Sequence, residues 1–174
     1  MTSKEIVIHR PKSSIMLTVF TLFILLSGTS ISAQTLNIEV KSDHAGQRLQ
    51  VDDRDFMVFG MNWGYMPIGQ NYTYDFWGKS DDFIKTALEK EMSLLQGMGV
   101  NAIRQYIGIP PRWVQYIYEN YGIWTILNHP VGRYGLTIDG VWVPATDYSD
   151  PKVISQIRGE IEQLAIEFRD TPGL

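Results

Sequence analysis

Two hydrophobic periods follow each other along this chain. Between residues 36 and 51, apolar side chains occupy every second position on either side of the turn-rich segment Ser42–Gly46. A period of two is typical of half-buried β-strands, so this part predicts a short hairpin, followed by a third extended run over Phe56–Trp63. A loop rich in glycine, tyrosine and tryptophan is expected from there to about Lys79.

Beyond Lys79 the apolar positions recur every three or four residues, which is the period of an amphipathic helix. Capping residues or prolines precede three such stretches, and apolar strands over Val100–Ile107 and Ile123–His129 separate them. A long loop is expected over residues 130–149. The three stripes are Ile84, Leu88, Met92, Leu95 and Met98; Val114, Ile117, Tyr118 and Tyr121; and Ile154, Ile157, Ile161, Leu164 and Phe168.

The order of elements predicts an α/β fold. Strands and helices alternate, and strands with few polar residues indicate a parallel sheet with helical crossovers. The glycines at 60, 64 and 69 match neither G-x-G-x-x-G nor G-x-x-x-x-G-K-S/T, the two glycine patterns of nucleotide-binding loops. The absence of these patterns favours a barrel over a doubly wound sheet. We therefore expect about three βα units from the N-terminal portion of a (β/α)8 TIM barrel.

The chain is short for such a barrel, which typically needs about 250 residues. Its expected domains are a β-hairpin segment over residues 34–55 and a partial barrel over residues 56–174, truncated before the fourth strand. Three parallel strands alone would leave a long edge unpaired. The alternative is a complete small three-layer domain.

The first 33 residues have the pattern of a secretory signal. Lys4, Arg10 and Lys12 precede an apolar run over Ile15–Leu26, and small polar residues lead to Ala33. A membrane anchor is the alternative, but a spanning helix needs about 20 apolar residues. The pattern predicts cleavage after Ala33 and a secreted or periplasmic protein.

Composition and charge exclude several functions. Lys and Arg total 15 against 19 Asp and Glu, a net charge of −4, so no basic surface is available for nucleic acid. The chain has no cysteine, which excludes a thiol nucleophile and cysteine-ligated metals. The histidines lack metal-ligand spacing, and the loop aspartates lack the intervals of a calcium loop. No metal and no cofactor are expected.

Polar residues follow the apolar part of each expected parallel strand. The pairs Asn62-Trp63 and Asn128-His129 and the run Arg104–Tyr106 hold these positions, where parallel α/β folds place their ligand sites. Arg104 shares strand parity with Val100 and Ala102, so it is expected to point into the barrel. A buried cation needs a partner, and we expect that partner outside this chain because no obvious one lies nearby.

Aromatic residues suggest a carbohydrate ligand. The chain has 5 Trp and 9 Tyr, and half of these lie in or beside the first and third loops that follow strands. Aromatic rings pack against the C–H faces of sugars while their polar tips form hydrogen bonds. Some rings could instead cover helices. The seven loop aromatics are Trp63, Tyr65, Tyr72, Tyr74, Trp77, Trp142 and Tyr148.

Several motifs resemble the catalytic barrel of retaining glycoside hydrolases, closest to the glycoside hydrolase family 2 type and to β-glucanosyltransferase-like proteins. The resemblance covers about residues 51–174, and the arginine motif is its most specific part. The motifs are Phe59–Trp63, Gly99–Tyr106, Asn128–Gly135, Ile138–Trp142, Thr146–Asp150 and Arg169–Gly173.

This resemblance implies a (β/α)8 barrel that cleaves or transfers β-glycosides through two glutamates about 5–5.5 Å apart. It also implies that Arg104 hydrogen-bonds the nucleophilic glutamate, while Asn62 and His129 line the subsite of the reacting sugar. Neither glutamate falls within the chain, so no catalytic residue is expected here. The alternatives are a non-catalytic carbohydrate-binding module and an inert remnant. The expected substrate-binding residues are Asn62, Trp63, Arg104, Tyr106, Asn128, His129, Arg133 and Tyr134.

Overall fold

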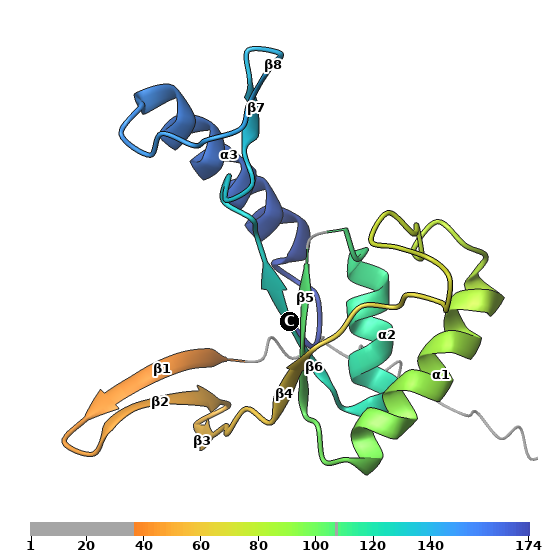
Figure 1. Cartoon of the computed structure of the whole chain (residues 1–174). Helices are drawn as coiled ribbons and strands as arrows, with labels where there is room; N and C mark the ends of the chain where they lie inside the picture. The colour runs from red at the N-terminus through yellow and green to blue at the C-terminus, as the bar shows by residue number, and fades with distance from the viewer. Residues whose placement is uncertain (1–36, 107) are drawn as a thin grey trace, which may run out of the picture. The chain divides into compact units, whose positions relative to one another are not determined.

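A computed structural model describes residues 37–106 and 108–174. The expected signal over residues 1–33 lies outside the described residues. No helix within them is long and apolar enough to cross a membrane. In chain order (Figure 1), the elements are β1 (Ile38–Asp43), β2 (Gly46–Val51), β3 (Arg54–Asp55), β4 (Gly60–Asn62), α1 (Asp81–Gly97), β5 (Ala102–Tyr106), α2 (Pro111–Tyr121), β6 (Trp124–Asn128), β7 (Leu136–Ile138), β8 (Val141–Val143) and α3 (Pro151–Phe168).

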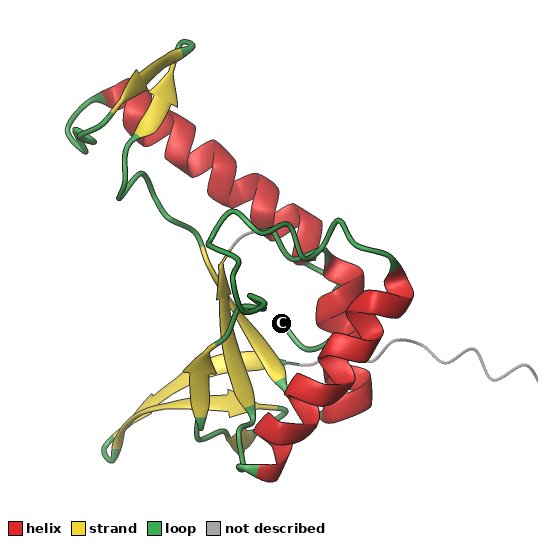
Figure 2. Ribbon diagram, turned by 45° about the vertical axis from the view of Figure 1, so that its right-hand side comes forward, coloured by secondary structure: helices red, strands yellow, loops and turns green. Residues whose placement is uncertain are grey.

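A parallel three-stranded sheet lies at the centre of the described part. Its strand order is β4-β5-β6, with Gly60 beside Ala102 and Ala102 beside Trp124. Helices α1 and α2 connect these strands and lie on the same side of the sheet (Figure 2). The expected α/β class with three parallel strands is confirmed. The described strands form three separate small sheets and no closed barrel.

Capping groups fix where the helices begin and end. The Ser80 hydroxyl accepts a hydrogen bond from the Phe83 N–H at the start of α1, and the Asp150 carboxylate accepts one from the Lys152 N–H at the start of α3. Pro111 begins α2, and Gly122 ends it with φ of 66°, a left-handed conformation that glycine adopts without strain. These boundaries agree with the sequence prediction to within one or two residues.

The core joins α1 and α2 to one face of the sheet. Ile103 of β5 points toward the helices and is fully buried. Arg104 and Tyr106 point to the other face of the sheet and are more accessible. Burial of these aliphatic side chains is the main stabilising term. The largest fully buried side chains are those of Ile84, Leu88, Met92, Ile103, Val114, Ile117 and Ile123.

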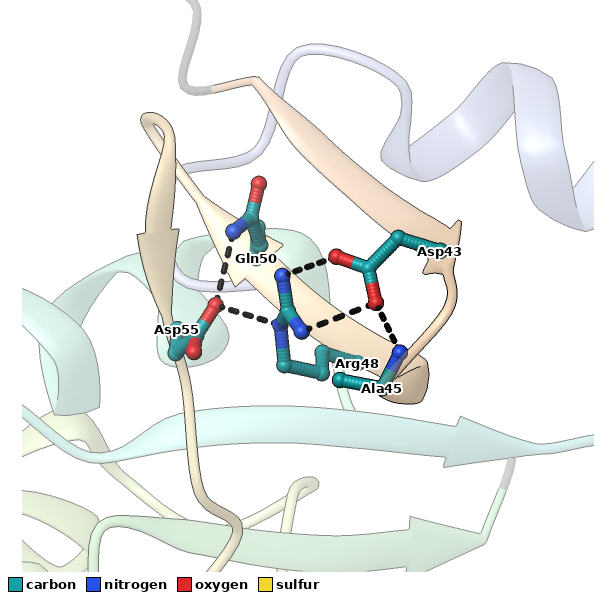
Figure 3. Close-up of polar contacts among 5 residues, drawn as sticks. All are labelled: Asp43, Ala45, Arg48, Gln50 and Asp55. Carbon is teal, nitrogen blue, oxygen red and sulfur yellow. Dashed lines mark hydrogen bonds and ion pairs between the residues drawn. The ribbon is translucent and has the colours of Figure 1, made fainter.

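The first hairpin forms as expected and carries a third short strand. Strands β1 and β2 pair antiparallel from Ile38 opposite Val51 to Asp43 opposite Gly46, and β3 pairs with β2. Only Gly60–Asn62 of the expected run over residues 56–63 joins the parallel sheet. The Arg48 guanidinium binds Asp43 through both terminal nitrogens and binds Asp55 through Nε, at 2.7–3.2 Å (Figure 3). Arg48 therefore ties the turn of the hairpin to its third strand.

The prediction of a loop over residues 130–149 is wrong, because this segment contains the hairpin β7–β8. Leu136 pairs with Val143 and Ile138 with Val141. Asp139 and Gly140 form the turn with φ of 49° and 80°. An Asp-Gly pair between alternating apolar residues favours this tight turn, whose two central residues both need positive φ.

Two expected core positions are exposed instead. Met98 lies just past the end of α1, and Ile161 lies in the middle of α3. Helix α3 packs at two places: Val153 and Ile157 contact Leu136 of β7, while Phe168 joins the core of the parallel sheet. Ile161 lies between these two clusters, so the apolar stripe of α3 is only partly buried.

Leu88→Ala is expected to lower the free energy of unfolding by about 2–5 kcal/mol, because it leaves a cavity in the core where Leu88 has no exposed surface. Leu94→Ala on the same helix is the matched control. Leu94 is 60% exposed, so its replacement should change stability by less than about 0.5 kcal/mol. Urea unfolding of both variants measures the difference, and equal losses would contradict this assignment of the core.

The hairpin is expected to weaken in acid. A hydrogen bond from the Ala45 N–H and then the Arg48 guanidinium lower the pKa of Asp43, while hydrogen bonds from Gln50 and Arg48 and the charge of Arg48 lower the pKa of Asp55. Groups with a lowered folded pKa stabilise the fold above their unfolded value, here about 3.8, and this contribution disappears as the pH falls through the folded pKa.

Carboxyl NMR titration of the wild type and Arg48→Met tests this. Loss of the guanidinium should move the pKa of both Asp43 and Asp55 upward, toward 3.8. Asp147 is the internal control. Its pKa is lowered by hydrogen bonds from Ser149, with no contribution from Arg48, and it should titrate alike in both proteins. Unchanged titration of Asp43 would refute the role of Arg48.

Candidate functional site

The ends of the three parallel strands bring three polar side chains together. Asn62 ends β4 directly beside Arg104 of β5, and Asn128 ends β6 beside Tyr106. Arg104 Nη1 donates to Asn62 Oδ1 at 3.2 Å, and its Nη2 donates to Asn128 Oδ1 at 2.5 Å. We name Asn62, Arg104 and Asn128 the arginine cluster.

The Arg104 guanidinium forms hydrogen bonds with uncharged amide oxygens. A guanidinium has five N–H donors, and two of them bind the asparagines. Within residues 37–106 and 108–174, no carboxylate lies within 4.0 Å of its nitrogens. The carbon Cζ lies 5.2 Å from the centre of the Tyr106 ring, a distance that permits a cation–π contact. The arginine cluster therefore presents positive charge and unused donors.

The arginine cluster is accessible from the side of the sheet away from α1 and α2. Alternation along β5 puts Ile103 and Gln105 on the helix side, where both are buried, and Arg104 and Tyr106 on the other side. Asn62 and Tyr106 are exposed, and Arg104 and Asn128 are half-buried. A ligand can therefore reach Arg104 without displacing the core.

Trp63 lies in the core, contrary to its expected role at the ligand. It is 8% exposed, and its ring makes edge contacts with Phe76 and Trp77. Its backbone N–H donates to the Arg104 carbonyl oxygen at 3.2 Å, so it helps to fix the strand that carries the arginine. Trp63 supports the arginine cluster and does not face it.

Most aromatic side chains of the first loop cover helices rather than line a cleft. Tyr65, Tyr74 and Trp77 pack against the main core, and Trp77 stacks on Trp113 of α2. Edge-to-face and offset contacts of this kind stabilise such clusters. Among the seven loop aromatics, the exposed side chains are those of Tyr72, Trp142 and Tyr148.

His129 contacts α3 rather than the arginine cluster. Its Nδ1 accepts a hydrogen bond from the Val131 N–H, and its Nε2 lies 3.4 Å from Glu160 Oε2. The side chain is 12% exposed. It lines a cleft of about 750 Å³ between α3 and the segments that follow β5 and β6, together with Pro110, Glu160 and Glu167. The expected residues thus fall into separate places.

Arg133 and Tyr134 lie on an exposed turn before β7. The Arg133 guanidinium carbon is 5.6 Å from the Tyr134 ring centre. No hydrogen bond among the described residues joins either of them to Arg104. They are therefore not part of the arginine cluster.

The arginine cluster can bind an anion or a hydroxyl-rich ligand. Its free N–H groups can donate to a carboxylate in a fork geometry or to sugar hydroxyls, and the asparagine amide nitrogens add donors. In the described ranges, no group of three His, Asp or Glu side chains is arranged to hold a metal ion.

Sequence reasoning misses two features of this region. It expects the partner of Arg104 outside the chain, although the amides of Asn62 and Asn128 already bind the guanidinium. The signal for this was present, because both asparagines end strands next to β5. It also misses Glu160, which lies 31 positions after His129 in α3 and belongs to no recognisable motif.

Comparison with known proteins gives one distant similarity. No protein-family model matches the chain, and no curated protein matches its sequence. Its backbone is similar to part of a solved structure described as β-D-glucuronidase from Dictyoglomus thermophilum, with a TM-score of 0.47 and 16% sequence identity. The similarity covers 79% of this chain and 22% of that one, so the chain spans about a fifth of the length of that protein.

Arg104→Met is expected to change the free energy of unfolding by less than about 1 kcal/mol. The substitution leaves no opposite charge unpaired, and water can reach the oxygen of the exposed Asn62. Breaking a buried ion pair would instead cost about 3–5 kcal/mol. Urea unfolding of the variant and of Arg104→Lys measures the effect. A loss above about 2 kcal/mol in Arg104→Met would indicate a structural arginine.

Proposed function

We propose that this chain supplies the sugar-binding part of a β-glycoside hydrolase of the TIM-barrel type. The observation that carries the proposal is the arginine cluster, in which a cation that binds two amide oxygens and no carboxylate of the described residues lies at the C-terminal edge of three parallel strands. Ligand sites of parallel α/β folds lie at this edge. The motifs that resemble retaining glycosidases include all three residues.

Arg104 has two roles in this proposal. Its unused donors bind a carboxylate and keep it ionised, since a nearby cation lowers the pKa of a carboxyl group. By the resemblance to retaining glycosidases, we propose that this carboxylate is the nucleophilic glutamate of the active site. The same guanidinium and the two asparagines orient the hydroxyls of the reacting sugar, so the ring is held before the nucleophile attacks.

The remaining expected residues have different proposed roles. Tyr106 lies against the Arg104 guanidinium and can cover one side of the sugar. His129 lies beside α3 and is proposed to shape the rim of the site through its contact with Glu160. The proposed location is secreted or periplasmic, with the leader over residues 1–33 removed.

Binding of β-linked oligosaccharides to the 174-residue chain tests the proposal. Arg104→Met and Asn128→Ala should each weaken binding of a β-linked glucose tetrasaccharide about ten-fold or more. Arg104→Met removes the guanidinium donors proposed to bind the sugar, and Asn128→Ala removes an amide that binds and orients that guanidinium. Isothermal titration calorimetry gives the dissociation constants.

Arg112→Met is the matched control for charge. Arg112 is exposed, lies in the first turn of α2 and pairs with Asp81, and no hydrogen bond among the described residues joins it to the arginine cluster. Its replacement should leave the affinity unchanged. Equal affinity of the wild type and Arg104→Met, or equal weakening in Arg112→Met, would refute the proposal.

A further inference from the structure

The hairpin β7–β8 has two different faces. Leu136 points toward α3 and is buried with Val153 and Ile157. Thr137 and its cross-strand partner Trp142 lie on the opposite face and are exposed. Because the inner face fills the contact with α3, the outer face is free to meet a ligand.

Glycine at position 135 lets the Trp142 ring rest on the backbone. A Cβ atom at this position would lie 2.6 Å from Trp142 Cζ2 and 2.5 Å from the Val143 carbonyl oxygen. Gly135 also has φ of 95°, which side-chain-bearing residues rarely adopt. Trp142 pairs with Thr137, and Gly135 lies two residues before Thr137. Residues diagonal to each other across a strand pair lie within reach of large rings. One side of the ring is therefore held in place.

Trp142 is unusual among the tryptophans of the chain. All five lie in the described ranges; Trp63 and Trp113 are buried, and Trp77 and Trp124 are half-buried. Trp142 is 59% exposed. Leaving so large an apolar surface in water is unfavourable. A tryptophan that packs on the backbone with one side and stays accessible on the other therefore marks a surface where a ligand can be bound.

The neighbours of this ring favour a sugar over a protein surface. Protein interfaces use contiguous apolar patches of several hundred Å², but the cross-strand neighbour of Trp142 is Thr137. The exposed ring of Tyr134 precedes Gly135, and Arg133 lies against that ring with its donors near solvent. The hairpin thus presents an exposed tryptophan face beside a threonine hydroxyl, and the segment just before it carries an exposed tyrosine and a guanidinium. These groups match a pyranose, which has an apolar C–H face and a rim of hydroxyls.

We propose that Trp142, with Tyr134 and Arg133, forms a second glycan-binding site separate from the arginine cluster. A hexopyranose unit stacks on the accessible face of Trp142, and Arg133 donates hydrogen bonds to its hydroxyls. The ligand class rests on the proposed function, because the site would hold another unit of the same β-linked glycan.

Tryptophan fluorescence of the full chain, titrated with β-1,4- and β-1,3-linked glucose tetrasaccharides, tests this site. The wild type should show a saturable change in emission. Trp142→Ala should lose that change and weaken binding about five- to ten-fold, and Trp142→Phe should retain part of the affinity. Tyr72→Ala removes an even more exposed aromatic side chain from another loop and should bind like the wild type.

Comparison with Arg104→Met separates this inference from the proposed function. If Arg104→Met retains the emission change and Trp142→Ala loses it, the second site is supported even where the arginine cluster binds nothing. If Trp142→Ala and Trp142→Phe both bind like the wild type while Arg104→Met does not, the second site is refuted and the proposed function stands. Absence of any binding by the wild type refutes both.

Urea unfolding and size-exclusion chromatography complete the test. Trp142→Ala should leave the urea midpoint within error, since its ring lies outside both apolar clusters. A dimer of the wild type that dissociates in Trp142→Ala would mean that a second copy of the chain covers the ring, and would overturn the proposal.

Discussion

The apolar contact between the parallel sheet and helices α1 and α2 is the constraint on which the other features depend. Ile103, Leu88 and Ile117 are fully buried at this contact. Because side chains alternate along a strand, burial of Ile103 requires that Arg104 points the other way. The core thus determines which face of β5 presents the cation, and a slip of one residue would bury the charge.

The arginine cluster combines this alternation with strand pairing. Parallel pairing puts Asn62 beside Arg104. Ile126 of β6 pairs with Arg104, and Asn128, two residues further along β6, lies within reach of Nη2. Two amide oxygens orient the guanidinium without neutralising it. An aspartate in either place would hold the arginine more tightly but would leave less positive charge for a ligand.

Strongly periodic segments could be predicted from the sequence. The first hairpin, the three helices and the three parallel strands follow from apolar spacing and from caps such as Ser80, Gly122 and Asp150. The hairpin β7–β8 was missed although its Asp139-Gly140 turn is a strong local signal. The alternation around that turn is only three residues long on each side, and it lies inside a stretch rich in glycine and proline.

Tertiary contacts explain the remaining differences. Trp63 and Tyr74 follow a strand end, where sequence reasoning expects ligand contacts, but nearby apolar helix surfaces bury or partly bury them. The position of His129 depends on Glu160, which no local pattern connects to it. The two asparagines that bind Arg104 end their strands in the sequence, but their pairing with Arg104 also depends on the strand register, which sequence spacing alone does not provide.

Helix α3 has a further consequence through its two separate apolar contacts. Its first turns hold β7–β8, its last turn joins the main core, and Ile161 between them packs against neither cluster. The two apolar clusters at the ends of α3 therefore share no buried side chain and are joined by the helix itself. Loss of the small cluster would free the hairpin while the parallel sheet stays folded, so the chain can open locally at this end without melting as a whole.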